Sequence, residues 1–206
     1  MEALESFGIA EFEKRTKAGD NAEIIILEAN LPEAVITAAC KRWNNKTLFF
    51  DPVSVSKAGK ACNNLGSFSI IKPNLYESLL LAGLKQDAVL SDTIQLAKKS
   101  AEIIHRSGVH EVFVSLGSLG LLYFSDSDCG IVRPLDMKPV NVSGAGDAAS
   151  AGIIWASISN YDTKQKARYA VASASLNASC AETVSKKMNQ NYLEELAKEV
   201  QHESVS

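Results

Sequence analysis

Short apolar runs alternate with longer segments of helical periodicity along most of this sequence, and this alternation limits the folds open to the chain. Short β-prone runs are typical of buried strands, whereas apolar residues three and four positions apart are typical of helices. The strand-like runs occupy residues 23–29, 47–51, 69–72 and 112–115. The helix-like segments occupy residues 33–43, 90–107, 148–159, 164–178 and 190–201. Strands joined by helices of this length form right-handed βαβ units, so we predict an α/β fold with a mostly parallel sheet flanked by helices.

A hairpin is also expected, because the apolar runs 121–124 and 130–133 flank a polar loop. In parallel sheets, ligands bind outside the carboxyl ends of the strands. Three segments fall at such ends and are therefore candidate binding segments: residues 72–77, 115–120 and 144–147.

Composition excludes several classes of function. The chain has 206 residues and a net charge of -3, so no basic excess argues for a nucleic-acid partner. Its apolar runs are too short to cross a bilayer, and its first residues lack the basic-then-apolar order of a signal peptide. The four cysteines are scattered without metal-ligand spacing. We expect reduced thiols, no membrane partner and a cytoplasmic location.

The segment Gly144-Ala145-Gly146-Asp147 has the residue types that phosphoryl transfer requires. Small residues let a backbone approach a ligand closely, and a helix that begins here would aim free N–H groups at an anion. An Asp at the same helix start can accept the proton of an attacking hydroxyl. The structural alternative is that the glycines only shape a turn and Asp147 caps the helix.

The wider segment 141–147, followed by Ala151-Gly152-Ile153, resembles the C-terminal signature of the PfkB (ribokinase) family of carbohydrate kinases. The resemblance implies a three-layer α/β/α fold, ATP as phosphoryl donor, an anion hole at residues 144–146 and Asp147 as catalytic base. Many members have Asp-Thr-Thr where this chain has Asn141-Val142-Ser143. The first of these positions is associated with a monovalent-cation site, so the need for such a cation stays open.

Two further segments match the same family. Asn74 and Glu77 fit its Asn-x-x-Glu motif, which is linked to Mg²⁺ and phosphate binding; a carboxylate there can hold a magnesium-bound water. The alternative is a helix cap, with Glu77 favoured by the helix dipole. Residues 114–120 resemble the nucleotide loop, which implies ATP contacts at Ser115, Gly117 and Gly120.

Asn177 falls where the family helix flanks the adenine pocket. We predict a nucleotide contact there, with a solvated helix Asn as the alternative. Residues 50–58 and 181–185 resemble segments of pseudouridine kinases, a branch of the family, so pseudouridine is the expected acceptor and ribokinase-like or adenosine-kinase-like activity the alternative. Asp51, at a strand end, faces the triphosphate or metal in one interpretation and caps a loop in the other.

The resemblance covers only the later part of the family's domain. We expect residues 22–201 to form a partial kinase domain, residues 1–21 an N-terminal segment at a cut edge, and residues 202–206 a disordered tail. The sequence contains no Gly-Gly pair, the early substrate motif of the family, and no segment for its lid. A fragment that binds nucleotide without catalysis is therefore an alternative function, and a preceding region or a dimer partner would have to cover the exposed sheet edge.

Overall fold

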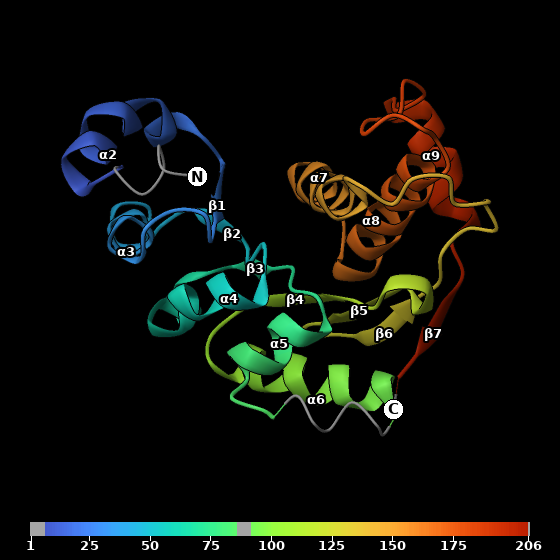
Figure 1. The fold of residues 1–206 in the computed structure, drawn as a ribbon, viewed down its shortest axis with the longest axis horizontal. Helices are drawn as coiled ribbons and strands as arrows, with labels where there is room; N and C mark the ends of the chain where they lie inside the picture. The colour runs from blue at the N-terminus through green and yellow to red at the C-terminus, as the bar shows by residue number, and fades with distance from the viewer. Residues whose placement is uncertain (1–6, 86–91, 206) are drawn as a thin grey trace. The chain divides into compact units, whose positions relative to one another are not determined.

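In the computed structural model of the chain, which describes residues 7–85 and 92–205, strands alternate with helices. The chain divides into two compact units, Met1–Val112 and Phe113–Ser206. Strand β4 (Glu111–Ser115) carries the backbone from the first unit into the second. Figure 1 shows the elements of each unit as a ribbon.

The first unit is built on parallel strands. The order is β1 (Ile24–Glu28), β2 (Thr47–Asp51), β3 (Ile70–Ile71) and β4. Each pairs in parallel with the next, with Phe50 opposite Ile71. The three central residues of β2 are all 0% exposed, which explains why this strand is a continuous apolar run rather than an alternating one.

The helices of the first unit follow the predicted pattern with small shifts. They are α2 (Ile9–Arg15), η1 (Thr16–Asn21), α3 (Glu33–Arg42), α4 (Val55–Ala58), η2 (Gly59–Ser67), α5 (Leu75–Leu81) and α6 (Thr93–Arg106). α6 begins where the Asp92 carboxylate accepts hydrogen bonds from the N–H groups of Ile94 and Gln95. Residues 90 and 91, included in the predicted helix, lie outside the described residues.

Residues 9–21, expected to be a segment at a cut edge, form α2 and η1 and are fastened to α3. Phe12 meets Trp43 edge to face, with 5.5 Å between ring centroids. The Asp20 carboxylate accepts hydrogen bonds from Arg42 and from the indole N–H of Trp43. Strand β1, which follows this segment in the sequence, is the first strand in the sheet order, and its Ile26 is 52% exposed.

The second unit combines antiparallel strands with helices. Its elements after β4 are η4 (Gly117–Leu119), β5 (Leu121–Phe124), β6 (Cys129–Val132), α7 (Ala145–Ile158), α8 (Thr163–Ala178), α9 (Gln190–Glu199) and β7 (His202–Ser204). β5 and β6 form the predicted hairpin. The structure therefore has a mixed, mostly parallel sheet flanked by helices, as the alternating pattern predicts.

The prediction of a disordered tail at residues 202–206 is wrong for residues 202–204. His202–Ser204 form β7, which pairs antiparallel with β6. Arg133 donates two hydrogen bonds to the Glu203 carboxylate, so side chains reinforce the backbone pairing. A three-residue strand has little apolar periodicity of its own, and its pairing with β6 depends on a partner far away in sequence.

Among residues 7–85 and 92–205, every helix is too short or too polar to span a bilayer. The expectation of no membrane partner drew on the same property of the sequence.

Core packing at the end of β2 gives a first testable prediction. Phe50 stacks on Phe68 with 4.5 Å between ring centroids, and both rings are buried. Phe50→Ala should lower the free energy of unfolding by about 3–5 kcal/mol, because it removes a buried ring and leaves a cavity. Urea unfolding in a Trp155→Phe background, followed by the fluorescence of Trp43 in the same unit, would measure this loss.

The control for this experiment is Ile26→Ala on the exposed face of β1, where Ile26 is 52% exposed. We expect this change to stay within about 0.5 kcal/mol of the parent. Equal losses for the two variants would contradict the assigned packing.

Candidate active site

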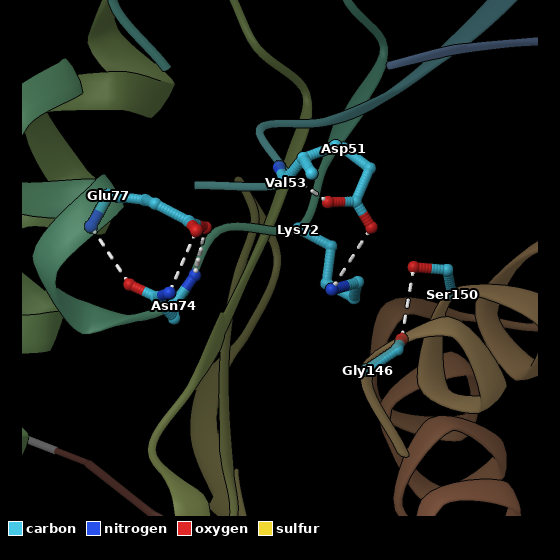
Figure 2. Close-up of polar contacts among 7 residues, drawn as sticks. All are labelled: Asp51, Val53, Lys72, Asn74, Glu77, Gly146 and Ser150. Atoms are coloured by element: carbon cyan, nitrogen blue, oxygen red, sulfur yellow. Dashed lines mark hydrogen bonds and ion pairs between the residues drawn. The ribbon is translucent and has the colours of Figure 1, made fainter. Parts of the chain in front are cut away.

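In the first unit, two charged residues lie at the carboxyl ends of adjacent parallel strands. Asp51 ends β2, and Lys72 follows directly after β3. The register that sets Phe50 opposite Ile71 places these next residues side by side. The Lys72 Nζ lies 3.3 Å from Asp51 Oδ2, and the two side chains are only 6% and 16% exposed (Figure 2). A buried ion pair thus occupies the edge of the sheet where parallel sheets bind ligands.

The other oxygen of Asp51 holds the loop after β2. Asp51 Oδ1 accepts a hydrogen bond of 3.0 Å from the N–H of Val53, also drawn in Figure 2. Val53 has φ = 63°, a region that β-branched residues rarely adopt. The loop-capping role considered for Asp51 is therefore present in the structure, and a role toward a triphosphate or metal stays a prediction.

The Asn74–Glu77 motif forms a complete capping box at the start of α5. Asn74 Oδ1 accepts from the N–H of Glu77 at 3.0 Å, and Glu77 Oε2 accepts from the N–H of Asn74 at 2.8 Å. The Asn74 amide also donates to Glu77 Oε1 at 2.8 Å (Figure 2). The helix cap that was the structural alternative for this motif is thus present. This arrangement leaves lone pairs on both carboxylate oxygens of Glu77 for a ligand.

Glu77 is a buried carboxyl group in a mixed electrostatic environment. The residue is only 4% exposed. Burial raises the pKa of Glu77, the Asn74 N–H and the positive charge of Lys72 oppose the rise, and the negative charge of Asp51 adds to it. Buried carboxyls with raised pKa values are frequent at functional sites.

In the second unit, the Gly144–Asp147 segment turns directly into helix α7. Gly144 is the N-cap residue, with φ = 78° in the left-handed region. Gly146 and Asp147 belong to the first helical turn, where no intrahelical carbonyl reaches the N–H groups. The Asp147 side chain is exposed, as a base that must reach an incoming hydroxyl has to be.

The two glycines of this turn differ in their surroundings. A Cβ on Gly144 would lie 2.7 Å from the carbonyl oxygen of Thr183, so only glycine fits there. A Cβ on Gly146 would meet nothing within 4 Å. Gly144 is therefore required by the fold of the turn, whereas the open space at Gly146 is free for a ligand. Ser150 Oγ donates to the Gly146 carbonyl from one turn further along α7 (Figure 2).

The predicted nucleotide loop is a tight turn after β4. The N–H of Leu116 donates to the Gly120 carbonyl at 2.8 Å, and Gly117 and Gly120 have φ values of 60° and 106°. A Cβ on Gly120 would lie 2.0 Å from the Val132 carbonyl oxygen. Ser115 is the last residue of β4 and is partly exposed. These glycines shape the loop, and their contacts with a nucleotide stay a prediction.

Asn177 is not the solvated helix residue that was one alternative, because it is only 1% exposed. Its amide Nδ2 donates to the Ser143 carbonyl at 3.2 Å, and its Oδ1 accepts from the N–H of Ser185 at 3.1 Å. Asn141 makes similar contacts: its Oδ1 accepts from the N–H of Ser143, and its Nδ2 donates to the Ala181 carbonyl. Two amides thus fasten the turn that precedes Gly144.

Sequence reasoning included Lys72 in the candidate binding segment 72–77, at a ligand-binding edge of the sheet, but gave its side chain no role. It gave Ser185 no role either, and no sequence signal points to one, because the bond of Ser185 to Asn177 depends on how the chain folds back after α8. Groups of three or more His, Cys, Asp or Glu that could hold a metal are absent from the described residues.

The α/β fold and the turn at the start of α7 agree with the family resemblance of the sequence. The sequence matches the model for the pfkB family of carbohydrate kinases over residues 3–190. The chain belongs to this family. The match begins before residue 22, where the resemblance was expected to start.

Known relatives agree with this assignment. The pseudouridine kinase of Escherichia coli (strain K12) is 30% identical over 164 residues, which are 79% of this chain and 50% of that protein. A carbohydrate kinase from Agrobacterium tumefaciens has a TM-score of 0.74 and 24% identity, over 96% of this chain and 60% of that one. Arabidopsis thaliana ribokinase, complexed with ribose and ATP, has a TM-score of 0.71 and 21% identity, over 93% of this chain and 59% of that one. The ribokinase-like fold is thus confirmed.

This chain spans about half the length of the curated relatives it matches. The activity of a whole relative therefore does not transfer to this chain directly.

The buried position of Glu77 predicts a dependence of stability on pH. Since its pKa is raised above the ordinary value of 4.5, the folded chain binds a proton that the unfolded chain has already released. Stability from this group is therefore present below pH 4.5 and falls as pH rises through the higher folded pKa. Glu77→Gln removes this loss, so the free energy of unfolding of the wild type should fall relative to the variant as pH increases.

Urea unfolding of both proteins at a series of pH values from 4 to 8 would measure this difference. Glu33→Gln, at the exposed start of α3, is the matched control for the loss of one carboxylate in the same unit. A constant difference between the wild type and Glu77→Gln over the whole range would contradict the raised pKa.

Proposed function

We propose that this chain carries the phosphoryl-transfer part of an ATP-dependent kinase that acts on a hydroxyl of a sugar or nucleoside. The observation that carries the proposal is the turn at residues 144–147. A glycine-fixed bend presents the free first turn of α7, with an exposed Asp147 in that turn. Family membership supplies the reaction class, since the relatives are kinases.

In the proposed reaction, the acceptor hydroxyl oxygen attacks the γ-phosphorus of ATP. Asp147 takes the hydroxyl proton, the bond from the γ-phosphorus to the bridging oxygen breaks, and ADP leaves with the electron pair. The N–H groups of Gly144 and Gly146, within the predicted anion hole at residues 144–146, stabilise the negative charge of the transferred group, while the N–H of Ala145 donates to the Val142 carbonyl at 3.2 Å. Donors fixed before the reaction stabilise this charge without a reorganisation cost.

Mg²⁺ would be held by Asn74 and Glu77 through water. Asn74 donates hydrogen bonds to both Glu77 oxygens, and each of these oxygens retains a lone pair that can accept from a metal-bound water. The residues therefore fit an indirect contact with the ion. When bound, Mg²⁺ would neutralise phosphate charge. The side chain of Lys72 would contribute a positive charge at the same edge of the sheet.

Pseudouridine is the acceptor that we propose. The E. coli pseudouridine kinase is 30% identical to this chain. The segment 50–58, which resembles that branch, is held by specific contacts: Lys57 Nζ donates to Asn30 Oδ1 at 2.7 Å, and Asp51 holds Val53. A ribokinase-like or adenosine-kinase-like acceptor is the alternative within the same chemistry.

A second candidate function is nucleotide binding without catalysis. It requires only the glycine-fixed turn and the first-turn N–H groups of α7, which the described residues supply. Transfer depends on positioning both substrates and excluding water, so binding of ATP alone is a weaker requirement. Binding of ATP and Mg²⁺ measured by calorimetry, together with no detectable turnover of any acceptor, would support this candidate.

Coupled ADP release tests the proposal and the role of Asp147. The chain is assayed with ATP, Mg²⁺ and, in turn, pseudouridine, uridine, ribose and adenosine. Asp147→Asn should lower kcat by about 100-fold or more, because it removes the proton acceptor. Asp136→Asn, in an exposed loop of the same unit, is the matched control and should retain full turnover.

Each outcome of this assay selects one interpretation. Turnover dominated by ribose or adenosine would replace pseudouridine as the acceptor. Equal turnover of Asp147→Asn and wild type would contradict the role of Asp147 as base. ATP binding without turnover on any acceptor would favour the non-catalytic candidate.

Gly146→Ala should separate stability from ligand binding. An added methyl group meets nothing within 4 Å, and replacing an exposed helical glycine with alanine stabilises a helix by about 1 kcal/mol. The same methyl group would occupy the space in front of the first-turn N–H groups. We therefore expect a higher melting temperature by circular dichroism and weaker ATP binding by calorimetry. Unchanged ATP affinity would argue against this turn as the phosphate site.

A further inference from the structure

The amide of Asn177 joins three segments that lie far apart in sequence. It projects from the end of α8, donates to the Ser143 carbonyl at 3.2 Å and accepts from the N–H of Ser185 at 3.1 Å. The residue is 1% exposed. A buried amide requires partners at both ends, and here the protein supplies them.

The bond to Ser143 fixes a specific peptide plane. The Ser143 carbonyl and the Gly144 N–H belong to one planar trans peptide, so they point in opposite directions. Holding the carbonyl toward Asn177 therefore turns the Gly144 N–H away from it. Gly144 itself sits close to the same amide, since its Cβ would lie 3.3 Å from Asn177 Nδ2.

Backbone bonds hold this part of the turn together with Asn177, and the N–H of Ala145 donates to the Val142 carbonyl at 3.2 Å, across the Ser143–Gly144 peptide. The N–H groups of Val140 and Asn141 both donate to the Ala178 carbonyl at the end of α8, and Asn141 Oδ1 accepts from the N–H of Ser143. These bonds hold the chain up to residue 143. The peptide between residues 143 and 144 is the next one, and Asn177 is the side chain that bonds to its carbonyl.

We propose that Asn177 is a positioning residue, which sets the Ser143–Gly144 peptide and thereby the start of α7 for anion binding. This inference rests on the proposed function of residues 144–147. Asn177 acts through the turn, because it is only 1% exposed and each end of its amide has a partner within the chain.

Two variants separate the two ends of the amide. Asn177→Asp keeps an acceptor for the N–H of Ser185 but loses the donor to the Ser143 carbonyl and repels that oxygen. Asn177→Leu has a similar volume and loses both bonds. Asn189→Ala serves as the control: Asn189 caps α9 by accepting from the N–H of Tyr192, so its loss destabilises the same unit without touching the turn.

The test is a titration with inorganic tripolyphosphate and, separately, ATP, followed by the backbone amide NMR signals of residues 144–147. All proteins are compared at a temperature at which circular dichroism shows them folded. We expect Asn177→Asp and Asn177→Leu to weaken tripolyphosphate binding about tenfold or more, the effect of leaving hydrogen-bonding groups misplaced, while Asn189→Ala stays within about twofold. Where the chain turns over, kcat should fall in the Asn177 variants with the KM of the acceptor unchanged.

The outcomes distinguish this inference from the proposed function. A wild-type chain that binds neither tripolyphosphate nor ATP at residues 144–147 overturns the proposed function. Wild-type binding that both Asn177 variants retain overturns only the positioning role. If Asn177→Leu does not fold, Asn177→Asp decides alone, and equal losses in Asn177→Asp and Asn189→Ala would reduce the role to stability and overturn the inference.

Discussion

The close approach of the backbone at Gly144 is the constraint on which the turn at residues 144–147 depends. The Thr183 carbonyl lies where a side chain at residue 144 would begin, and the left-handed φ of 78° excludes most other residues on its own account. With this bend in place, α7 begins at Ala145, and its free N–H groups stand beside an exposed Asp147. Removing the bend would displace the first-turn N–H groups and Asp147 together. The amides of Asn141 and Asn177 support this one conformation of the turn.

The first unit keeps charged side chains at a buried edge of the sheet. Lys72 and Asp51 have exposed fractions of 6% and 16%, and Glu77 is equally buried beside Asn74. Taking charges out of water is costly unless they are paired and hydrogen-bonded, and here the ion pair and the capping box supply those partners. Apolar residues would fill this space with a smaller desolvation penalty. Charge at this edge is consistent with a phosphate-binding role.

Family membership and activity are separate questions for this chain. The pfkB family model covers residues 3–190, and the folds of a carbohydrate kinase and a ribokinase agree with it. The protein spans only about half of its curated relatives, however. Phosphoryl transfer is accelerated almost wholly by positioning and electrostatics. A chain can therefore retain the turn and the base while its turnover depends on what holds the acceptor, which is why binding and turnover have to be measured separately.

Periodicity and local chemistry in the sequence determined the fold class, the strands β1–β6, the helices α3 and α6–α9, and the Gly144–Asp147 turn, because each depends on neighbouring residues. The capping box at Asn74 was also readable, since its partners are three residues apart. Tertiary structure alone decided the rest. β7 forms only because β6 lies beside it, the Lys72–Asp51 pair depends on the register of two strands, and Asn177 becomes a clamp only when residues 143 and 185 reach the end of α8. Such contacts join residues far apart in the chain, where sequence spacing carries no information about distance.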